Sequence, residues 1–163
     1  WSSDVCSSDL RPESYGYVKA RSSDPFEHPE IQPNYLAAET DQRVILAAIK
    51  ICRKLGQTEA LKPYVVEETF PGVACQSDNE LLNSAREIGQ SIYHLMGTCR
   101  MGSKTDKAAV VDNELKVHGI KNLRVIDASI MPTMVSANLN AAVMMIAEKG
   151  ADMVLGKSVQ GLH

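Results

Sequence analysis

The segment that follows Asn140 constrains the fold of this chain more than any other. Its sequence, AAVMMIAEKGADMVL over residues 141–155, predicts a helix that is apolar around most of its circumference. A helix at the surface of a small domain would carry a polar face from its first turn, and this one almost lacks a polar face at its start. We therefore expect the helix to be buried inside a larger protein.

Composition and charge exclude several classes of partner. The chain has 163 residues, 17 basic and 20 acidic side chains and a net charge of −3, with no block of like charge. This balance argues against nucleic acid or an anionic membrane as a partner. No run of about 18 apolar residues occurs, so no membrane span is expected. The four cysteines lie far apart in sequence, so neither a metal site nor a redox pair is predicted.

The N-terminal half has a mixed pattern of strand, loop and helix. Residues 1–10, WSSDVCSSDL, repeat Ser-Ser-Asp without apolar periodicity, and we interpret them as a sequence artefact that takes no part in the fold. Residues 15–21 alternate as in a strand, and the proline-containing stretch after them predicts an extended loop without helix.

Two helices are predicted before residue 90. Residues 41–55 carry apolar side chains at helical spacing, with Thr40 as the expected N-cap and Gly56 as the stop. A second helix is predicted from Asp78, because Ser77 and Glu80 fit a capping box.

The character of the chain changes near residue 90. Glycine-containing loops follow, then LRVID at residues 123–127, which predicts a buried strand, and then the apolar helix. We expect an α+β fold in two parts, residues 11–90 and residues 91–163.

Three short segments carry residues suited to chemistry. His94 lies in the loop YHLMGTCRMG, where a neutral imidazole could accept a proton; a core histidine that bonds a backbone carbonyl is the alternative. Asp127 ends the predicted strand before small residues, which suits binding of a nucleotide cofactor, although it could simply cap a turn. Asn138 and Asn140 precede the apolar helix, whose N-terminus can stabilise negative charge; ordinary N-capping is the alternative.

In this order the segments resemble the C-terminal signature of the glucose-methanol-choline (GMC) family of FAD oxidoreductases. The matching stretches are YHxxGTCRMG, VVDxxLKVHGIKNLRVIDASIMP and ANLNAAVMMIAEKGADM. Their sequences resemble the choline dehydrogenase-like branch of the family most. The resemblance implies FAD as the cofactor and oxidation of an alcohol CH–OH group. It also implies that residues 11–90 are part of a substrate-binding domain with an antiparallel sheet and helices. Residues 91–163 would be the C-terminal strand and helix of an FAD-binding α/β domain.

The resemblance also implies a role for particular residues. His94 would be the catalytic base and Asn138 its partner, with Asn138 donating a hydrogen bond to the alkoxide oxygen. Asp127 and Ala128 would contact the phosphate or ribityl part of FAD, and Asn138, Asn140 and Ala141 would face the pyrimidine edge of the flavin. The chain departs from many members at Leu95, where they have proline. His118 and Cys99 are assigned no catalytic role.

Two alternatives to alcohol oxidation are also compatible with the resemblance. A family member that cleaves or forms a carbon–carbon bond to cyanide would use the same site without net redox, and a non-catalytic domain could retain the fold. No GxGxxG turn occurs in this sequence, so we expect a fragment that needs the N-terminal part of its own chain to bind FAD and is inactive alone. Its expected substrate is a small alcohol. Its expected location is the cytoplasm, with membrane contact only through an electron acceptor.

Overall fold

The computed structural model describes residues 11–157, which form two compact units. The N-terminal unit is Pro12–Gln90, and the C-terminal unit consists of residues 91–157 together with Arg11. The interpretation of residues 1–10 falls outside the described residues. None of the helices in residues 11–157 is both long and apolar enough to cross a membrane.

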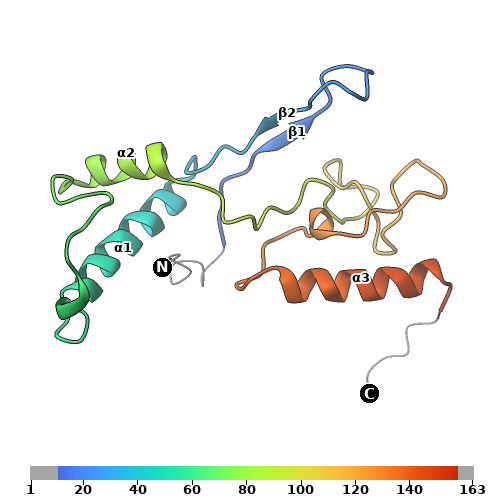
Figure 1. The fold of residues 1–163 in the computed structure, drawn as a ribbon. Coiled ribbons are helices and arrows are strands. Elements are labelled where there is room, and N and C mark those ends of the chain that lie inside the picture. The colour runs from blue at the N-terminus through green and yellow to red at the C-terminus, as the bar shows by residue number, and fades with distance from the viewer. Residues whose placement is uncertain (1–10, 158–163) are drawn as a thin grey trace. The chain divides into compact units, whose positions relative to one another are not determined.

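A two-stranded antiparallel sheet begins the N-terminal unit (Figure 1). Strand β1, Tyr17–Lys19, pairs with β2, Glu30–Gln32, and Val18 lies opposite Ile31. The backbones approach closely just before β1, since a Cβ on Gly16 would lie 2.0 Å from the carbonyl oxygen of Gln32. The predicted strand is confirmed. The stretch after it contains no helix, as expected, but it contains β2.

Two helices complete the N-terminal unit and pack against each other (Figure 1). Helix α1 is Glu39–Gly56 and α2 is Asp78–Ile88, with the short helix η2, Lys62–Tyr64, between them. The capping box predicted for α2 is present: Ser77 accepts the Glu80 backbone N–H, and the Glu80 carboxylate accepts the Ser77 backbone N–H at 2.8 Å.

The predicted ends of α1 are wrong by one or two residues. Its N-cap is Ala38 without a side-chain cap, so Thr40 lies inside the helix, and Gly56 is its last residue. Tertiary contacts replace the missing cap. The Ala38 backbone N–H donates to Ser14 Oγ at 3.0 Å, and Asp41 in the first turn accepts the backbone N–H groups of Glu13 and Ser14 at 2.9 Å. These contacts stabilise a helix start that no local capping rule predicts.

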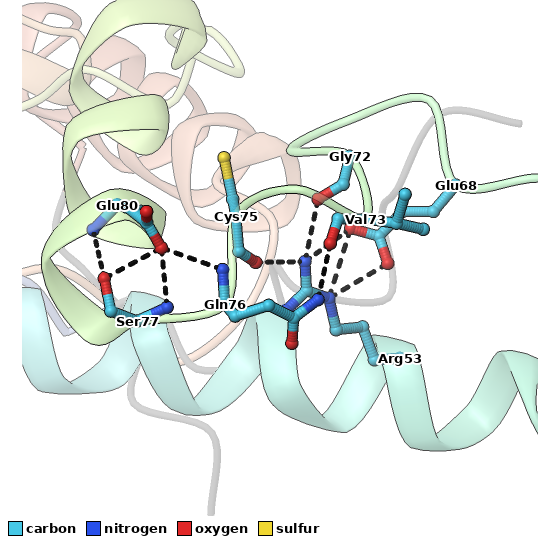
Figure 2. A network of polar contacts seen from close by, with 8 residues as sticks. All are labelled: Arg53, Glu68, Gly72, Val73, Cys75, Gln76, Ser77 and Glu80. Carbon is cyan, nitrogen blue, oxygen red and sulfur yellow. Dashed lines mark hydrogen bonds and ion pairs between the residues drawn. The ribbon is translucent and has the colours of Figure 1, made fainter.

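Arg53 of α1 holds the loop that leads to α2 (Figure 2). Its Nε and Nη2 atoms donate to both carboxylate oxygens of Glu68, the shortest contact being 2.7 Å, and Nη2 also donates to the carbonyl oxygens of Gly72 and Cys75. The Arg53 and Glu68 side chains are 19% and 25% exposed. The Nε–Oε2 and Nη2–Oε1 bonds make the pair a bidentate ion pair, and hydrogen bonding to Glu68 raises the pKa of Arg53.

The C-terminal unit has an apolar core to which helix α3, Asn140–Val154, contributes, and the short helix η3, Ala128–Ile130, packs against α3 (Figure 1). The buried core residues are Val111, Leu115, Ile130, Met131, Leu139 and Ile146. Only Ile146 and Gly150 of α3 are buried, while Met144 and Met145 are 62% and 57% exposed. The predicted apolar helix is confirmed. Within the described residues, much of its apolar surface is not covered by other parts of the chain.

The buried strand predicted at residues 123–127 is not present as a strand. Among the described residues this segment pairs only through an isolated bridge between Arg124 and Lys116, and the Val125 N–H donates to the Leu115 carbonyl. A ladder needs successive pairs on an adjacent strand, and Asp127 ends the segment as the N-cap of η3. The described residues nevertheless combine helices with a small antiparallel sheet, as the α+β prediction requires.

Candidate active site

The loop that carries His94 is anchored along one side by backbone hydrogen bonds. We call residues 91–101 the His loop. Every second amide of its C-terminal half donates to a carbonyl in the η3 segment. The pairs are Gly97 to Ala128 at 3.4 Å, Cys99 to Ser129 at 2.9 Å and Met101 to Ile130 at 2.7 Å. This backbone contact holds the His loop beside Asp127 and Ala128, the two residues for which the family resemblance implies contact with the phosphate or ribityl part of the cofactor.

Two residues of the His loop adopt left-handed backbone conformations. Gly97 has φ = 85°, and a Cβ there would lie 3.4 Å from the carbonyl oxygen of Met131. Tyr93 has φ = 65° although it is not glycine, and its backbone N–H donates to Ser91 Oγ at 3.0 Å. A residue with a side chain in this region carries backbone strain, which the surrounding contacts must offset. The strained residue directly precedes His94.

His94 and Asn138 meet although 44 residues separate them. Asn138 Nδ2 donates to His94 Nε2 at 3.1 Å. The other end of the same amide, Oδ1, accepts the backbone N–H of Asn140 at 2.9 Å. His94 is half-buried and Asn138 is exposed, so the pair lies at the surface of the C-terminal unit.

The start of α3 is electrostatically suited to an anionic group. Leu139 has no side-chain cap, the first turn contains no acidic residue, and Asn140 and Ala141 are both exposed. Asn138 Oδ1 takes up the Asn140 N–H, one of the amides that lack a partner inside the helix. No carboxylate in the first turn of α3 therefore compensates the partial positive charge of the helix N-terminus.

Asp127 and Ala128 are placed by the turn into η3. Asp127 is exposed and its Oδ1 accepts the Ser129 backbone N–H at 2.7 Å, so it caps the turn, as the alternative interpretation had it. Ala128 is half-buried and bonds the His loop through its carbonyl. Among the described residues, no hydrogen bond joins Asp127 to His94 or Asn138. The five residues assigned to cofactor binding thus fall into two groups, one at η3 and one at the start of α3.

Sequence reasoning missed several contacts that position the site. The bonds from the His loop to η3 join backbone amides to backbone carbonyls, so no side-chain pattern in the sequence predicts them. Arg11 Nε donates to Ser136 Oγ at 2.5 Å, close to Asn138, and no motif connects these residues. His118 Nε2 contacts the carbonyl oxygen of Gly102 at 3.1 Å, which is a structural role.

Comparison with known proteins identifies the family. The family model for GMC oxidoreductase matches residues 12–147. Human mitochondrial choline dehydrogenase is 48% identical over 91% of this chain, and oxygen-dependent choline dehydrogenase of Escherichia coli is 45% identical over the same share. The chain spans 25% and 26% of the length of these two relatives, so it corresponds to about a quarter of them.

A solved structure is similar as well. The FAD-dependent oxidoreductase from Chaetomium thermophilum has a TM-score of 0.80 and 29% identity, over 90% of this chain and 25% of that one. FAD is the cofactor of the family. The sequence resemblance is therefore confirmed, and the chain belongs to the GMC oxidoreductase family.

Proposed function

We propose that this chain carries the proton-accepting site of an FAD-dependent enzyme that oxidises the CH–OH group of a small alcohol. The observation that supports this most is the 3.1 Å contact between His94 Nε2 and Asn138 Nδ2 at the surface of the C-terminal unit. A base and a hydrogen-bond donor side by side can act on one alcohol oxygen, the first removing its proton and the second stabilising the resulting alkoxide.

The residues around this pair fit a flavin. The first turn of α3 has no acidic residue and offers partial positive charge, and Asn140 and Ala141 are exposed there, so the pyrimidine edge of a flavin would be held by Asn138, Asn140 and Ala141. Asp127 uses Oδ1 within the turn, and among the described residues Oδ2 makes no hydrogen bond. Asp127 and Ala128 would bind the phosphate or ribityl part.

We assign a different domain of the enzyme to each of the two units. Residues 91–163 would belong to the FAD-binding domain and residues 11–90 to the substrate-binding domain, with the rest of both supplied by the N-terminal part of the protein.

In the reaction His94 Nε2 takes the hydroxyl proton and Asn138 Nδ2 donates to the oxygen that loses it. FAD, when bound, would accept the carbon-bound hydrogen as hydride at N5. The His loop keeps the base fixed against η3 during this transfer.

Steady-state turnover of the full-length protein tests the proposal. With a panel of aliphatic, aromatic and amino alcohols, we expect His94→Gln to lower turnover by about 10²- to 10⁴-fold, the usual contribution of a general base. FAD content, read from the visible absorbance, should be unchanged. His118→Gln is the matched control, because the His118 side chain contacts the Gly102 backbone carbonyl in the same unit and has no role in the proposed reaction.

The rival activity has its own readout. A cyanohydrin would be cleaved to a carbonyl compound and cyanide without net reduction of the flavin. Cleavage of cyanohydrins together with no oxidation of any alcohol in the panel would replace the proposed activity with the rival one. His94→Gln turnover equal to that of the control would contradict the role of His94 as the base. The cytoplasm is the proposed location.

A further inference from the structure

The amide of Asn138 has a fixed orientation because its two ends meet different partners. Oδ1 lies 2.9 Å from the backbone nitrogen of Asn140, and Nδ2 lies 3.1 Å from His94 Nε2. A backbone N–H can only donate, so the amide end that faces Asn140 must be the oxygen. The nitrogen then has to face His94, even though the two ends of an asparagine amide are similar in shape.

This orientation decides which nitrogen of His94 carries a proton. A carboxamide nitrogen has two N–H donors and no lone pair that accepts. The contact with Nε2 is therefore a hydrogen bond only when Nε2 is the acceptor, which in a neutral ring puts the proton on Nδ1. With a proton on Nε2, two N–H groups would point at each other.

We propose that the first backbone amide of α3 sets the tautomer of His94. The Asn140 N–H orients the Asn138 amide, and that amide keeps Nε2 unprotonated. The inference rests on the proposed function, in which Nε2 is the atom that accepts the alcohol proton. Asn138 is thus a positioning residue for the base as well as the donor to the alkoxide.

The same geometry describes how an alcohol enters the pair. Before the alcohol binds, the Nε2 lone pair accepts from Asn138. The alcohol hydroxyl replaces that bond by two: its O–H donates to Nε2, and its oxygen accepts from Nδ2. The Oδ1 contact with Asn140 is retained, so the amide does not rotate while the substrate enters.

An isosteric substitution inverts the pattern. In Asn138→Asp one carboxylate oxygen still accepts the Asn140 N–H, and the other faces Nε2. A carboxylate oxygen only accepts, so Nε2 must carry a proton and has no lone pair for the alcohol. Asn138→Leu is the control of similar size, since it removes the contact without imposing a tautomer. Asn140→Ala is the second control, because it keeps the backbone N–H that orients Asn138.

Nitrogen NMR of the full-length, FAD-loaded protein with ¹⁵N-labelled histidine reads the tautomer directly. His94 signals are assigned by their loss in His94→Gln. We expect the proton on Nδ1 in the unsubstituted protein and in Asn140→Ala, and on Nε2 in Asn138→Asp. Turnover of Asn138→Asp should fall at least about tenfold below that of Asn138→Leu, since a wrong histidine tautomer costs up to about 10⁴-fold in enzymes with a Ser-His-Asp triad.

Three results would overturn the inference. These are a proton on Nε2 in the unsubstituted protein, an Nε2 that stays without a proton in Asn138→Asp, and Asn138→Asp turnover equal to that of Asn138→Leu. Failure of the proposed function is a separate result. It would appear as normal turnover in His94→Gln, whereas the nitrogen shifts report the tautomer whether or not the protein turns over alcohol.

Discussion

Gly150 brings the backbone of α3 close to the Ile126 side chain, and replacing it with alanine tests that packing. A Cβ at Gly150 would lie 2.4 Å from Cγ2, 3.0 Å from Cδ1 and 3.3 Å from Cγ1 of Ile126. Overpacking of this kind costs about 1–3 kcal/mol. Alanine in place of glycine inside a helix contributes about 0.8–1 kcal/mol in the opposite direction. The net effect of Gly150→Ala should be a loss of about 1 kcal/mol.

The sign should reverse when Ile126 is shortened. In an Ile126→Ala background the clash is gone and only the helix propensity remains, so Gly150→Ala should stabilise α3 by up to about 1 kcal/mol. Hydrogen exchange of peptides from residues 140–157 measures the local opening free energy. We expect exchange about fivefold faster in the first background and about fivefold slower in the second, because 1.4 kcal/mol corresponds to about tenfold.

Gly56 provides the matched control for this experiment. It is the last residue of α1, and a Cβ there would meet only Val65 Cγ2 at 3.8 Å, an ordinary contact. Gly56→Ala should therefore slow exchange in α1 peptides. If Gly150→Ala also slowed exchange with Ile126 intact, or had the same effect in both backgrounds, the close packing of α3 on Ile126 would be refuted.

Three further predictions concern other parts of the chain. Arg53→Ala leaves the half-buried Glu68 carboxylate and the Cys75 carbonyl without the donor that Arg53 supplies, so unfolding in urea should show a loss of about 1–3 kcal/mol, while the conservative Arg53→Lys loses less. Gly97→Ala forces a left-handed residue with a side chain beside the base, at a cost of about 1–2 kcal/mol, and kcat should fall more than KM rises. Burial alone would raise the pKa of Asp41, but hydrogen bonds from Ser14 and Glu13 outweigh it and lower the pKa below 3.8. The stability that Asp41 contributes is complete above its unfolded pKa and is lost as the pH falls through the lower folded pKa, so Asp41→Asn should flatten the acid side of a stability curve.

Local sequence rules predicted the elements whose causes are local. The capping box at Ser77 and Glu80 is complete within four residues, and the start of α2 was predicted correctly. The start of α1 was not, because Ser14 and Asp41 stabilise it through contacts that span 27 residues. The segment at residues 123–127 has the composition of a strand, yet a strand also needs a neighbour, and composition does not supply one.

The candidate site shows the same division. The residue types at His94 and Asn138 were visible in the sequence, and the family resemblance suggested that they act together. Their 3.1 Å contact and the orientation of the Asn138 amide depend on the backbone N–H of Asn140, which no side-chain pattern reveals. The anchoring of the His loop on η3 likewise uses only backbone atoms.

The role of His94 as the base is tested most directly by the rate of flavin reduction in a single turnover. The full-length protein is mixed with alcohol without oxygen, and loss of flavin absorbance is followed by stopped flow. We expect His94→Gln to slow this step by about 10²- to 10⁴-fold, while His118→Gln stays close to the unsubstituted protein. Flavin reduction at the same rate in both variants would contradict it.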